Sequence, residues 1–214
     1  QEITDRGFEH ICGYLRPGVT EREIAIELES FMRREGSEGV AFPSIVASGP
    51  NSALPHAHAT SRAIESGDFV TMDFGARAGG YCADMTRTLV LGTASSRQRE
   101  VYEAVLAAQL AGIEAVQPDR AGKDIDAAAR AVLIDAGLGE YFVHGLGHGV
   151  GLEVHELPGV GMFSEEPVRL GSVVTMEPGV YIESFGGVRI EDSVVVQDDG
   201  ARVLPQSPKT LIEL

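Results

Sequence analysis

The sequence predicts an α+β domain built from an internal repeat, and three observations support this fold class. The segment Gly67-Asp-Phe-Val-Thr-Met-Asp73 returns as Gly171-Ser-Val-Val-Thr-Met-Glu177, at an offset of 104 residues (171 − 67). Segments with helical periodicity precede both copies, at an offset of 101 residues. Glycine pairs follow both copies, as expected for β-hairpins. We therefore expect two halves, approximately residues 1–97 and 98–214, related by a pseudo-two-fold axis.

Each half is predicted to begin with a pair of helices. Residues 1–36 carry apolar side chains at helical spacing and are interrupted once by a proline. The second helix of this pair begins with the capping-box signature Thr20-x-x-Glu23. Residues 101–136 show the same periodicity, again interrupted by a proline. The sequence therefore predicts four helices in two equivalent pairs.

Strands are predicted after each helix pair. In the first half, we expect residues 40–48 to be extended and residues 69–74 and 80–91 to form a hairpin about a Gly-Gly turn. In the second half, strands are expected at residues 173–182, 187–197 and 202–204. A β-hairpin in each half would bring the ends of the repeated segments to equivalent places in the fold.

The composition restricts the class of protein. A net charge of −15 over 214 residues argues against nucleic acid or an anionic membrane as a partner. No apolar segment approaches the roughly 20 residues of a membrane span. Cys12 and Cys82 form no Cys-x-x-Cys motif, so we expect two free thiols and a cytoplasmic protein. A homodimer is possible, and the sequence does not decide whether the chain forms one.

Four carboxylates lie at or near the ends of predicted strands. Asp73 ends one strand, and Asp84 lies eleven residues further along, beyond the hairpin turn. Glu177 and Glu191 stand fourteen residues apart around the second glycine pair, which predicts a mirrored arrangement in the second half. Four carboxylates converging from two hairpins are costly to bury unless they bind a metal. We therefore expect a metal site between the halves.

A glycine-rich segment brings three histidines close together in the sequence. His144, His148 and His155 lie within residues 144–156, where glycine occupies every second position from 145 to 151. Such a segment does not form a helix, and its glycines allow close backbone approach. His56 adds a fourth imidazole from the first half. These histidines are candidates for metal ligands or for groups that bind substrate.

The candidate ligands restrict the metal and the chemistry. An oxygen-rich set with one imidazole suits Mn²⁺, Fe²⁺, Co²⁺ or Zn²⁺ in a reactive site more than a structural zinc site. Four carboxylates and one imidazole are sufficient for two divalent ions about 3.5–4 Å apart, an arrangement used for hydrolysis. Manganese is the metal that we expect first. The chain contains no Gly-x-Ser-x-Gly motif, P-loop or dinucleotide-binding fingerprint.

These residues resemble the active-site pattern of the pita-bread-fold metallopeptidases, the superfamily of methionine aminopeptidase, prolidase and aminopeptidase P. The resemblance covers almost the whole chain. In order along the sequence, the matching residues are His56, Asp73, Asp84, His148, His155, Glu177 and Glu191. The resemblance implies a single catalytic domain over residues 1–214, with a curved antiparallel sheet covered by helices.

The resemblance also implies a role for each residue. The metal ligands would be Asp73, Asp84, His148, Glu177 and Glu191, with Asp84 and Glu191 bridging two ions. The catalytic residues would be His56, His155 and Glu177, of which Glu177 would transfer the proton. The substrate-binding residues would be His56, His144, His155 and Arg189.

Flanking residues resemble the proline-specific branch of the superfamily. The segments concerned are residues 144–156, Glu177-Pro-Gly-Val-Tyr and Gly187-Val-Arg-Ile-Glu-Asp. Methionine aminopeptidases usually lack counterparts of His144 and Arg189. We therefore expect a Xaa-Pro aminopeptidase that hydrolyses the Xaa-Pro bond at peptide N-termini with a metal-bridged hydroxide. Members of this branch typically carry a separate N-terminal domain, which this sequence does not contain.

Three alternatives stay open. The chain is a methionine aminopeptidase if it releases Met from Met-Ala peptides and spares Xaa-Pro substrates. A Xaa-Pro dipeptidase, or prolidase, has the same motifs as aminopeptidase P and is not separated from it by the sequence. The third alternative is a metal-free relative, either a creatinase-like hydrolase or a peptide-binding module. Such relatives usually lose metal ligands, and all five are present here.

Overall fold

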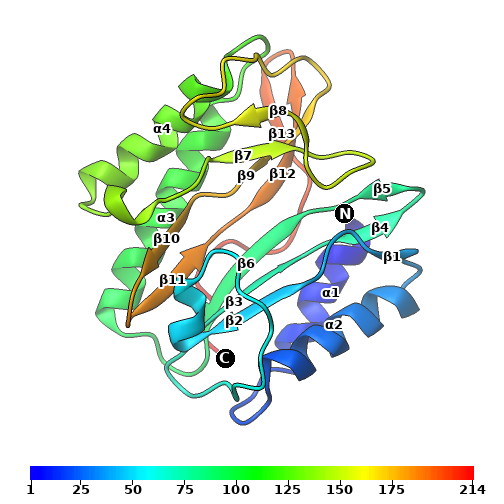
Figure 1. Cartoon of the computed structure of the whole chain (residues 1–214), viewed down its shortest axis with the longest axis vertical. Coiled ribbons are helices and arrows are strands. Elements are labelled where there is room, and N and C mark those ends of the chain that lie inside the picture. The colour runs from blue at the N-terminus through cyan, green and yellow to red at the C-terminus, as the bar shows by residue number, and fades with distance from the viewer.

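Two pairs of helices flank a set of antiparallel strands in the computed structural model, which describes residues 1–214 (Figure 1). The α-helices are α1 (Glu2–Cys12), α2 (Glu21–Arg34), α3 (Ser96–Ala115) and α4 (Gly122–Asp135). Short 3-10 helices are η1 (Gly49–Ala53) and η2 (Gly139–Tyr141). The two predicted helix pairs are confirmed. The capping box at the start of α2 is also formed, since the Thr20 hydroxyl accepts a hydrogen bond from the Glu23 backbone and the Glu23 carboxylate accepts one from the Thr20 backbone.

The strands follow the helix pairs in both halves. In the first half they are β1 (Gly39–Val40), β2 (Ile45–Ser48), β3 (Phe69–Phe74), β4 (Ala76–Ala78), β5 (Tyr81–Cys82) and β6 (Met85–Val90). In the second half they are β7 (Gly147–Gly149), β8 (Glu156–Val160), β9 (Val173–Met176), β10 (Gly179–Ile182), β11 (Gly186–Arg189), β12 (Asp192–Gln197) and β13 (Gly200–Val203). Pairing between neighbouring strands is antiparallel throughout.

The strands form four hydrogen-bonded groups. Their orders are β2-β3-β6, β1-β4-β5, β13-β12-β9-β7-β8 and β10-β11. Three strands that the sequence predicts as continuous are interrupted, and a candidate ligand lies at each interruption. Asp84 lies between β5 and β6, Glu177 between β9 and β10, and Glu191 between β11 and β12. After Glu177 comes Pro178, which has no N–H to donate to a neighbouring strand.

The predicted repeat extends to the pairing register of the strands. In the first half, Ser48 of β2 pairs with Val70 of β3, and in the second half Gly149 of β7 pairs with Val174 of β9. The two pairs differ by the offsets read from the sequence, 101 (149 − 48) and 104 (174 − 70). The internal pseudo-symmetry is therefore confirmed at the level of backbone pairing. It places Ala47 of the first half at the position that His148 occupies in the second.

Each helix pair covers the strands of its own half. Ile24 and Leu28 of α2 share one buried apolar cluster with Met72 of β3. Val105 of α3 shares a second cluster with Val174 of β9. The helices thus lie outside and the inner strands of the two halves lie next to one another, with the β3–β6 and β9–β12 ladders side by side (Figure 1). None of the helices combines the length and apolar character that a membrane crossing requires.

Side-chain and backbone hydrogen bonds join the two halves along β6 and β12. The Glu191 N–H donates to the Thr86 carbonyl at 3.1 Å. The Thr88 hydroxyl donates to the Arg189 carbonyl at 2.9 Å, and the Ser193 hydroxyl donates to the Asp84 carbonyl at 3.0 Å. The last two bonds are related by the repeat, because 193 − 88 and 189 − 84 both equal 105. The pseudo-two-fold axis therefore passes between β6 and the β11–β12 segment.

Candidate metal centre and active site

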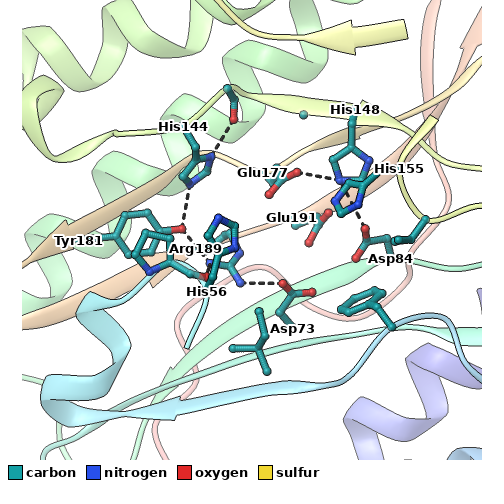
Figure 2. Close-up of a pocket in the computed structure, with 16 residues that line it drawn as sticks. His56, Asp73, Asp84, His144, His148, His155, Glu177, Tyr181, Arg189 and Glu191 are labelled. Atoms are coloured by element: carbon teal, nitrogen blue, oxygen red, sulfur yellow. Dashed lines mark hydrogen bonds and ion pairs between the residues drawn. The ribbon is translucent and has the colours of Figure 1, made fainter. Parts of the chain in front are cut away.

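A cavity of about 290 Å³ lies between the two halves, and all nine predicted site residues line it (Figure 2). They are His56, Asp73, Asp84, His144, His148, His155, Glu177, Arg189 and Glu191. The tertiary structure thus brings together side chains from β3, β7, β11 and the connections around them. Their individual roles are not decided by this proximity and remain predictions.

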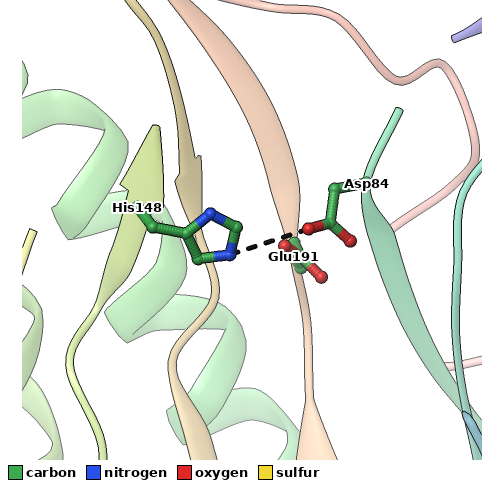
Figure 3. Close-up of side chains that lie close together, drawn as sticks. All are labelled: Asp84, His148 and Glu191. Carbon is green, nitrogen blue, oxygen red and sulfur yellow. Dashed lines mark ion pairs between the residues drawn. The ribbon is translucent and has the colours of Figure 1, made fainter. Parts of the chain in front are cut away.

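Three of the predicted ligands are close enough to share one ion. Single ligand atoms of Asp84, His148 and Glu191 lie within 4.8 Å of one another (Figure 3). Glu177 lies beside this group, with its Oε1 at 3.1 Å from His148 Nε2. Asp73 lines the same cavity and is held by Arg189 at 2.7 Å.

The predicted mirrored arrangement of the acids is only half right. Asp73 pairs with Thr86 in the β3–β6 ladder, so Asp84, two residues earlier, lies diagonally across from Asp73. In the second half, the pairs Met176–Asp192 and Gly179–Arg189 place Glu177 directly opposite Glu191. Asp73 and Glu177 are therefore equivalent, whereas Asp84 and Glu191 are not. Strand register, which the spacing in the sequence does not reveal, produces this difference.

The cavity strongly disfavours the negative charges that it contains. Burial and the neighbouring carboxylates, Glu191 first among them, raise the pKa of Asp84 well above its ordinary value. Burial, together with Glu177 and Asp73, raises the pKa of Glu191 in the same way. Burial alone would also raise the pKa of Glu177, but the hydrogen bond from His148 reverses this, and the pKa is lowered. A bound cation would relieve this mutual repulsion.

The orientation of His148 also suits a cation. Its Nδ1 lies 3.0 Å from the Gly149 carbonyl, which can only accept, so Nδ1 carries a hydrogen. In the neutral ring, the Nε2 lone pair then points toward Asp84 and Glu177, at 3.6 and 3.1 Å. A lone pair facing carboxylates is favourable only when a proton or a metal ion lies between them. Such a carbonyl partner is typical of metal-binding histidines.

Two carboxylate oxygens of the cavity also favour a bound cation. Asp73 Oδ1 and Glu191 Oε1 are buried and have no hydrogen-bond partner. The other oxygen of each carboxylate is held by the protein, Asp73 Oδ2 by Arg189 and Glu191 Oε2 by Thr86. Buried carboxylate oxygens without donors are costly unless they face a cation. The donor set, one imidazole and four carboxylates, therefore fits a divalent metal.

Arg189 connects the metal-facing acids to the substrate side of the cavity. One of its Nη atoms donates to Asp73, and the other donates to the Tyr181 hydroxyl at 2.8 Å. Tyr181 lies 2.9 Å from His144 Nε2, while His144 Nδ1 faces the Gly145 carbonyl at 2.8 Å. Because that carbonyl can only accept, Nε2 accepts from Tyr181. Both ring nitrogens of His144 are thus used within the protein, so its predicted contact with substrate would involve the ring carbons.

His56 and His155 lie at the exposed mouth of the cavity. The His155 ring lies 4.3 Å from the His148 ring, measured between centroids. Burial and the neighbouring His148 lower the pKa of His155, so its ring tends to be neutral. No protein hydrogen bond occupies either ring. His56 and His155 are therefore free to donate to a bound ligand.

Several residues of the cavity were not predicted from the sequence. Tyr181 stands in the segment Glu177-Pro-Gly-Val-Tyr, whose resemblance to proline-specific enzymes was a usable signal. Phe42, Ile45 and Val154 also line the cavity, and they carry no sequence signal because isolated apolar residues occur throughout the chain. The two cysteines, by contrast, are unpaired as predicted.

Known proteins resemble this chain over its whole length. The chain is 49% identical to the structure of a Xaa-Pro dipeptidase from Bacillus anthracis, with a TM-score of 0.98, covering 100% of this chain and 60% of that one. It is 43% identical to an X-Pro aminopeptidase from Thermotoga maritima, with a TM-score of 0.97 and coverage of 100% and 60%. The Xaa-Pro dipeptidase of Pyrococcus furiosus is 44% identical over 99% of this chain and 61% of its own length. The chain thus spans about 60% of the length of these relatives.

The fold and the site together define a class of protein. Antiparallel strands enclosed by paired helices, with acids and imidazoles facing each other across a pseudo-two-fold axis, are those of a pita-bread-fold peptidase. The chain belongs to metallopeptidase family M24, whose model matches residues 1–198. The predicted fold and the predicted resemblance are therefore both confirmed.

Proposed function

We propose that this chain is the catalytic unit of an exopeptidase that hydrolyses the Xaa-Pro bond, with Xaa-Pro dipeptides as its first class of substrate. The observation that carries this proposal is the cavity in which five metal-ligand candidates lie next to two unoccupied imidazoles. The names of several relatives, Xaa-Pro dipeptidases from Pyrococcus and Bacillus, favour a dipeptidase over the aminopeptidase expected from the sequence. A homodimer and a cytoplasmic location remain predictions.

The metal would be held by Asp73, Asp84, His148, Glu177 and Glu191. Two divalent ions, manganese first among the candidates, are our proposal for the number and kind. When bound, such ions lower the pKa of a coordinated water and polarise the carbonyl of the substrate. The buried carboxylates of Asp84 and Glu191 are close to other carboxylates that raise their pKa values. Bound ions with a high positive charge would relieve this repulsion, which supports the proposal of two divalent ions.

Glu177 is the residue that we assign to proton transfer. As a ligand of the metal it would be ionised and so able to accept a proton. The Thr175 hydroxyl donates to Glu177 Oε1 at 3.1 Å and itself accepts from the His148 backbone N–H at 3.0 Å. This pair of bonds orients the carboxylate toward the cavity. Glu177 would take the proton of the attacking water and pass it to the proline nitrogen that leaves.

His56 and His155 are assigned to the substrate. Their free ring N–H groups would donate to the scissile carbonyl as charge develops on its oxygen, or to the carboxylate of a dipeptide. Arg189 has a different task, because it already donates to Asp73, Tyr181, Thr86 and the Pro55 carbonyl. It would hold the acids and Tyr181 in place.

The reaction is tested by comparing substrates of different length with manganese-loaded protein. Leu-Pro is the dipeptide chosen, because Phe42, Ile45 and Val154 give the cavity lining some apolar surface. We expect proline release from Leu-Pro with a higher kcat/KM than leucine release from Leu-Pro-Ala, and loss of both after chelation. Cleavage of Met-Ala peptides with no turnover of Leu-Pro would contradict the proposal and indicate a methionine aminopeptidase.

Replacement of His155 by Ala is expected to lower kcat by about 10²–10³-fold while metal binding is retained, because a donor to the transition state is lost but no ligand is. The measurement is Leu-Pro hydrolysis alongside metal content by elemental analysis. His58→Ala is the matched control, since His58 is also exposed but does not line the cavity. An equal effect of the two substitutions would remove His155 from the reaction.

A further inference from the structure

Thr86 of β6 lies directly behind a predicted metal ligand. Its side chain is fully buried, and its Oγ1 is 2.6 Å from Glu191 Oε2 and 3.1 Å from Arg189 Nε. An arginine Nε–H can only donate, so the threonine oxygen accepts from Arg189. The single hydroxyl hydrogen is therefore directed to Glu191. This arrangement leaves the hydroxyl no other orientation that satisfies both neighbours.

The contact decides which oxygen of Glu191 is held by the protein. Oε2 accepts the hydroxyl hydrogen, whereas Oε1 is buried with no partner. Asp73 shows the same pattern, with Oδ2 held by Arg189 at 2.7 Å and Oδ1 without a partner. The chain of bonds Asp73–Arg189–Thr86–Glu191 thus runs through both halves of the molecule. At each end it leaves one carboxylate oxygen free for a cation.

Backbone pairing keeps Thr86 in this position. The Glu191 N–H donates to the Thr86 carbonyl at 3.1 Å, which fixes the two residues next to each other across the pseudo-two-fold axis. Strand register makes them equivalent, because Asp73 pairs with Thr86 just as Glu177 lies opposite Glu191. Two identical halves would therefore place two carboxylates against each other here. A hydroxyl in one half and a carboxylate in the other removes that repulsion and supplies a donor.

We propose that Thr86 is a positioning residue of the metal centre, whose hydroxyl orients Glu191 toward the metal and couples it through Arg189 to Asp73. This inference rests on the proposed function of the cavity. It assigns to Thr86 a contribution to metal affinity that goes beyond its contribution to stability. Hydrogen-bonded neighbours of metal ligands typically change metal affinity or activity by about 10–100-fold when they are altered.

The test is the affinity of metal-free protein for Mn²⁺, measured by titration calorimetry for Thr86→Val, Thr86→Ser and Thr4→Val. Valine keeps the shape of threonine but removes the donor, so we expect a dissociation constant about 10–100-fold higher. Serine retains the hydroxyl and should bind as wild type does. Thr4 is equally buried, and its hydroxyl oxygen accepts only from the Ala76 backbone N–H, away from the cavity. Thr4→Val should therefore lower the unfolding temperature without changing Mn²⁺ affinity.

The outcomes separate this inference from the proposed function. Wild-type affinity in a folded Thr86→Val protein overturns the role of Thr86, and so does a loss in Thr4→Val as large as that in Thr86→Val. If Thr86→Val does not fold, Thr86→Ala must show the same loss of affinity, and normal affinity there again overturns it. Absence of Mn²⁺ binding by wild type contradicts the metal site itself, whatever the variants do.

Discussion

Asp84→Asn should abolish metal binding and peptidase activity together. Asparagine keeps the shape of the side chain but removes the charge at the centre of the cluster formed with His148 and Glu191. The loss of metal affinity should exceed the ~10–100-fold that changes to the neighbours of ligands cause. Metal content by elemental analysis and turnover of Leu-Pro measure the two effects.

The same substitution should stabilise the metal-free protein. Because the pKa of Asp84 is raised in the folded state, the folded state resists its ionisation, and at neutral pH this lowers the free energy of unfolding. A neutral side chain removes that cost, so the unfolding temperature in the presence of chelator should rise. Asp119→Asn is the control, because Asp119 forms only an exposed pair with Arg169. Metal-dependent activity near wild type in Asp84→Asn would show that the ligand assignment is wrong.

Arg87→Met is expected to lower the free energy of unfolding by about 3–5 kcal/mol, more than any other substitution that we propose. Arg87 is 1% exposed, and all five of its N–H groups donate hydrogen bonds. The acceptors are the backbone carbonyls of Thr86, Glu191, Ser207 and Pro208 and the carboxylate of Asp192. Methionine fills much of the space but leaves the buried carbonyls of Glu191, Ser207 and Pro208 without donors. Asp192 loses its arginine partner but keeps its contacts with Gln109 and Lys209.

Urea unfolding of Arg87→Met and of two further variants measures this effect. In Arg169→Met the lost pair with Asp119 is exposed on both sides, so the change should be within about 1 kcal/mol. Adding Asp192→Asn to Arg87→Met should recover little of the loss, since the Asp192 carboxylate keeps Lys209 at 2.7 Å and Gln109 at 3.0 Å when Arg87 is absent. Equal effects of Arg87→Met and Arg169→Met would show that burial does not strengthen the Arg87 pair.

The Arg87–Asp192 pair also shows how the repeat has diverged. Met72 pairs with Arg87 and Met176 pairs with Asp192, and the two methionines are equivalent in the repeated segment. Arg87 and Asp192 therefore occupy equivalent positions, and they meet at 2.7 Å across the axis. Identical halves would bring two like charges together at this point. The ion pair is possible only because the halves differ, as is the neighbouring contact between Thr86 and Glu191.

Several parts of the fold followed from local patterns. The helix pairs were predictable because apolar spacing and capping residues act within a few positions of one another. The hairpins were predictable from their glycine turns. The boundaries of the long strands were not, because Asp84, Glu177 and Glu191 interrupt them where side chains turn into the cavity. The order and chemical type of the candidate ligands were visible in the sequence alone.

The repeat, the candidate ligands and the family that they resemble could be read from the amino-acid sequence, because these depend on residue type and spacing. The folded structure was needed to show how the acids face each other, since the hairpin register selects which side chains are opposite and the spacing does not. It also decided that both nitrogens of His144 are used within the protein and that Thr86 and Arg87 lie behind Glu191. The contacts of Thr86 and Arg87 with Glu191 join residues 105 and 104 positions apart, so they form only when the two halves pack against each other.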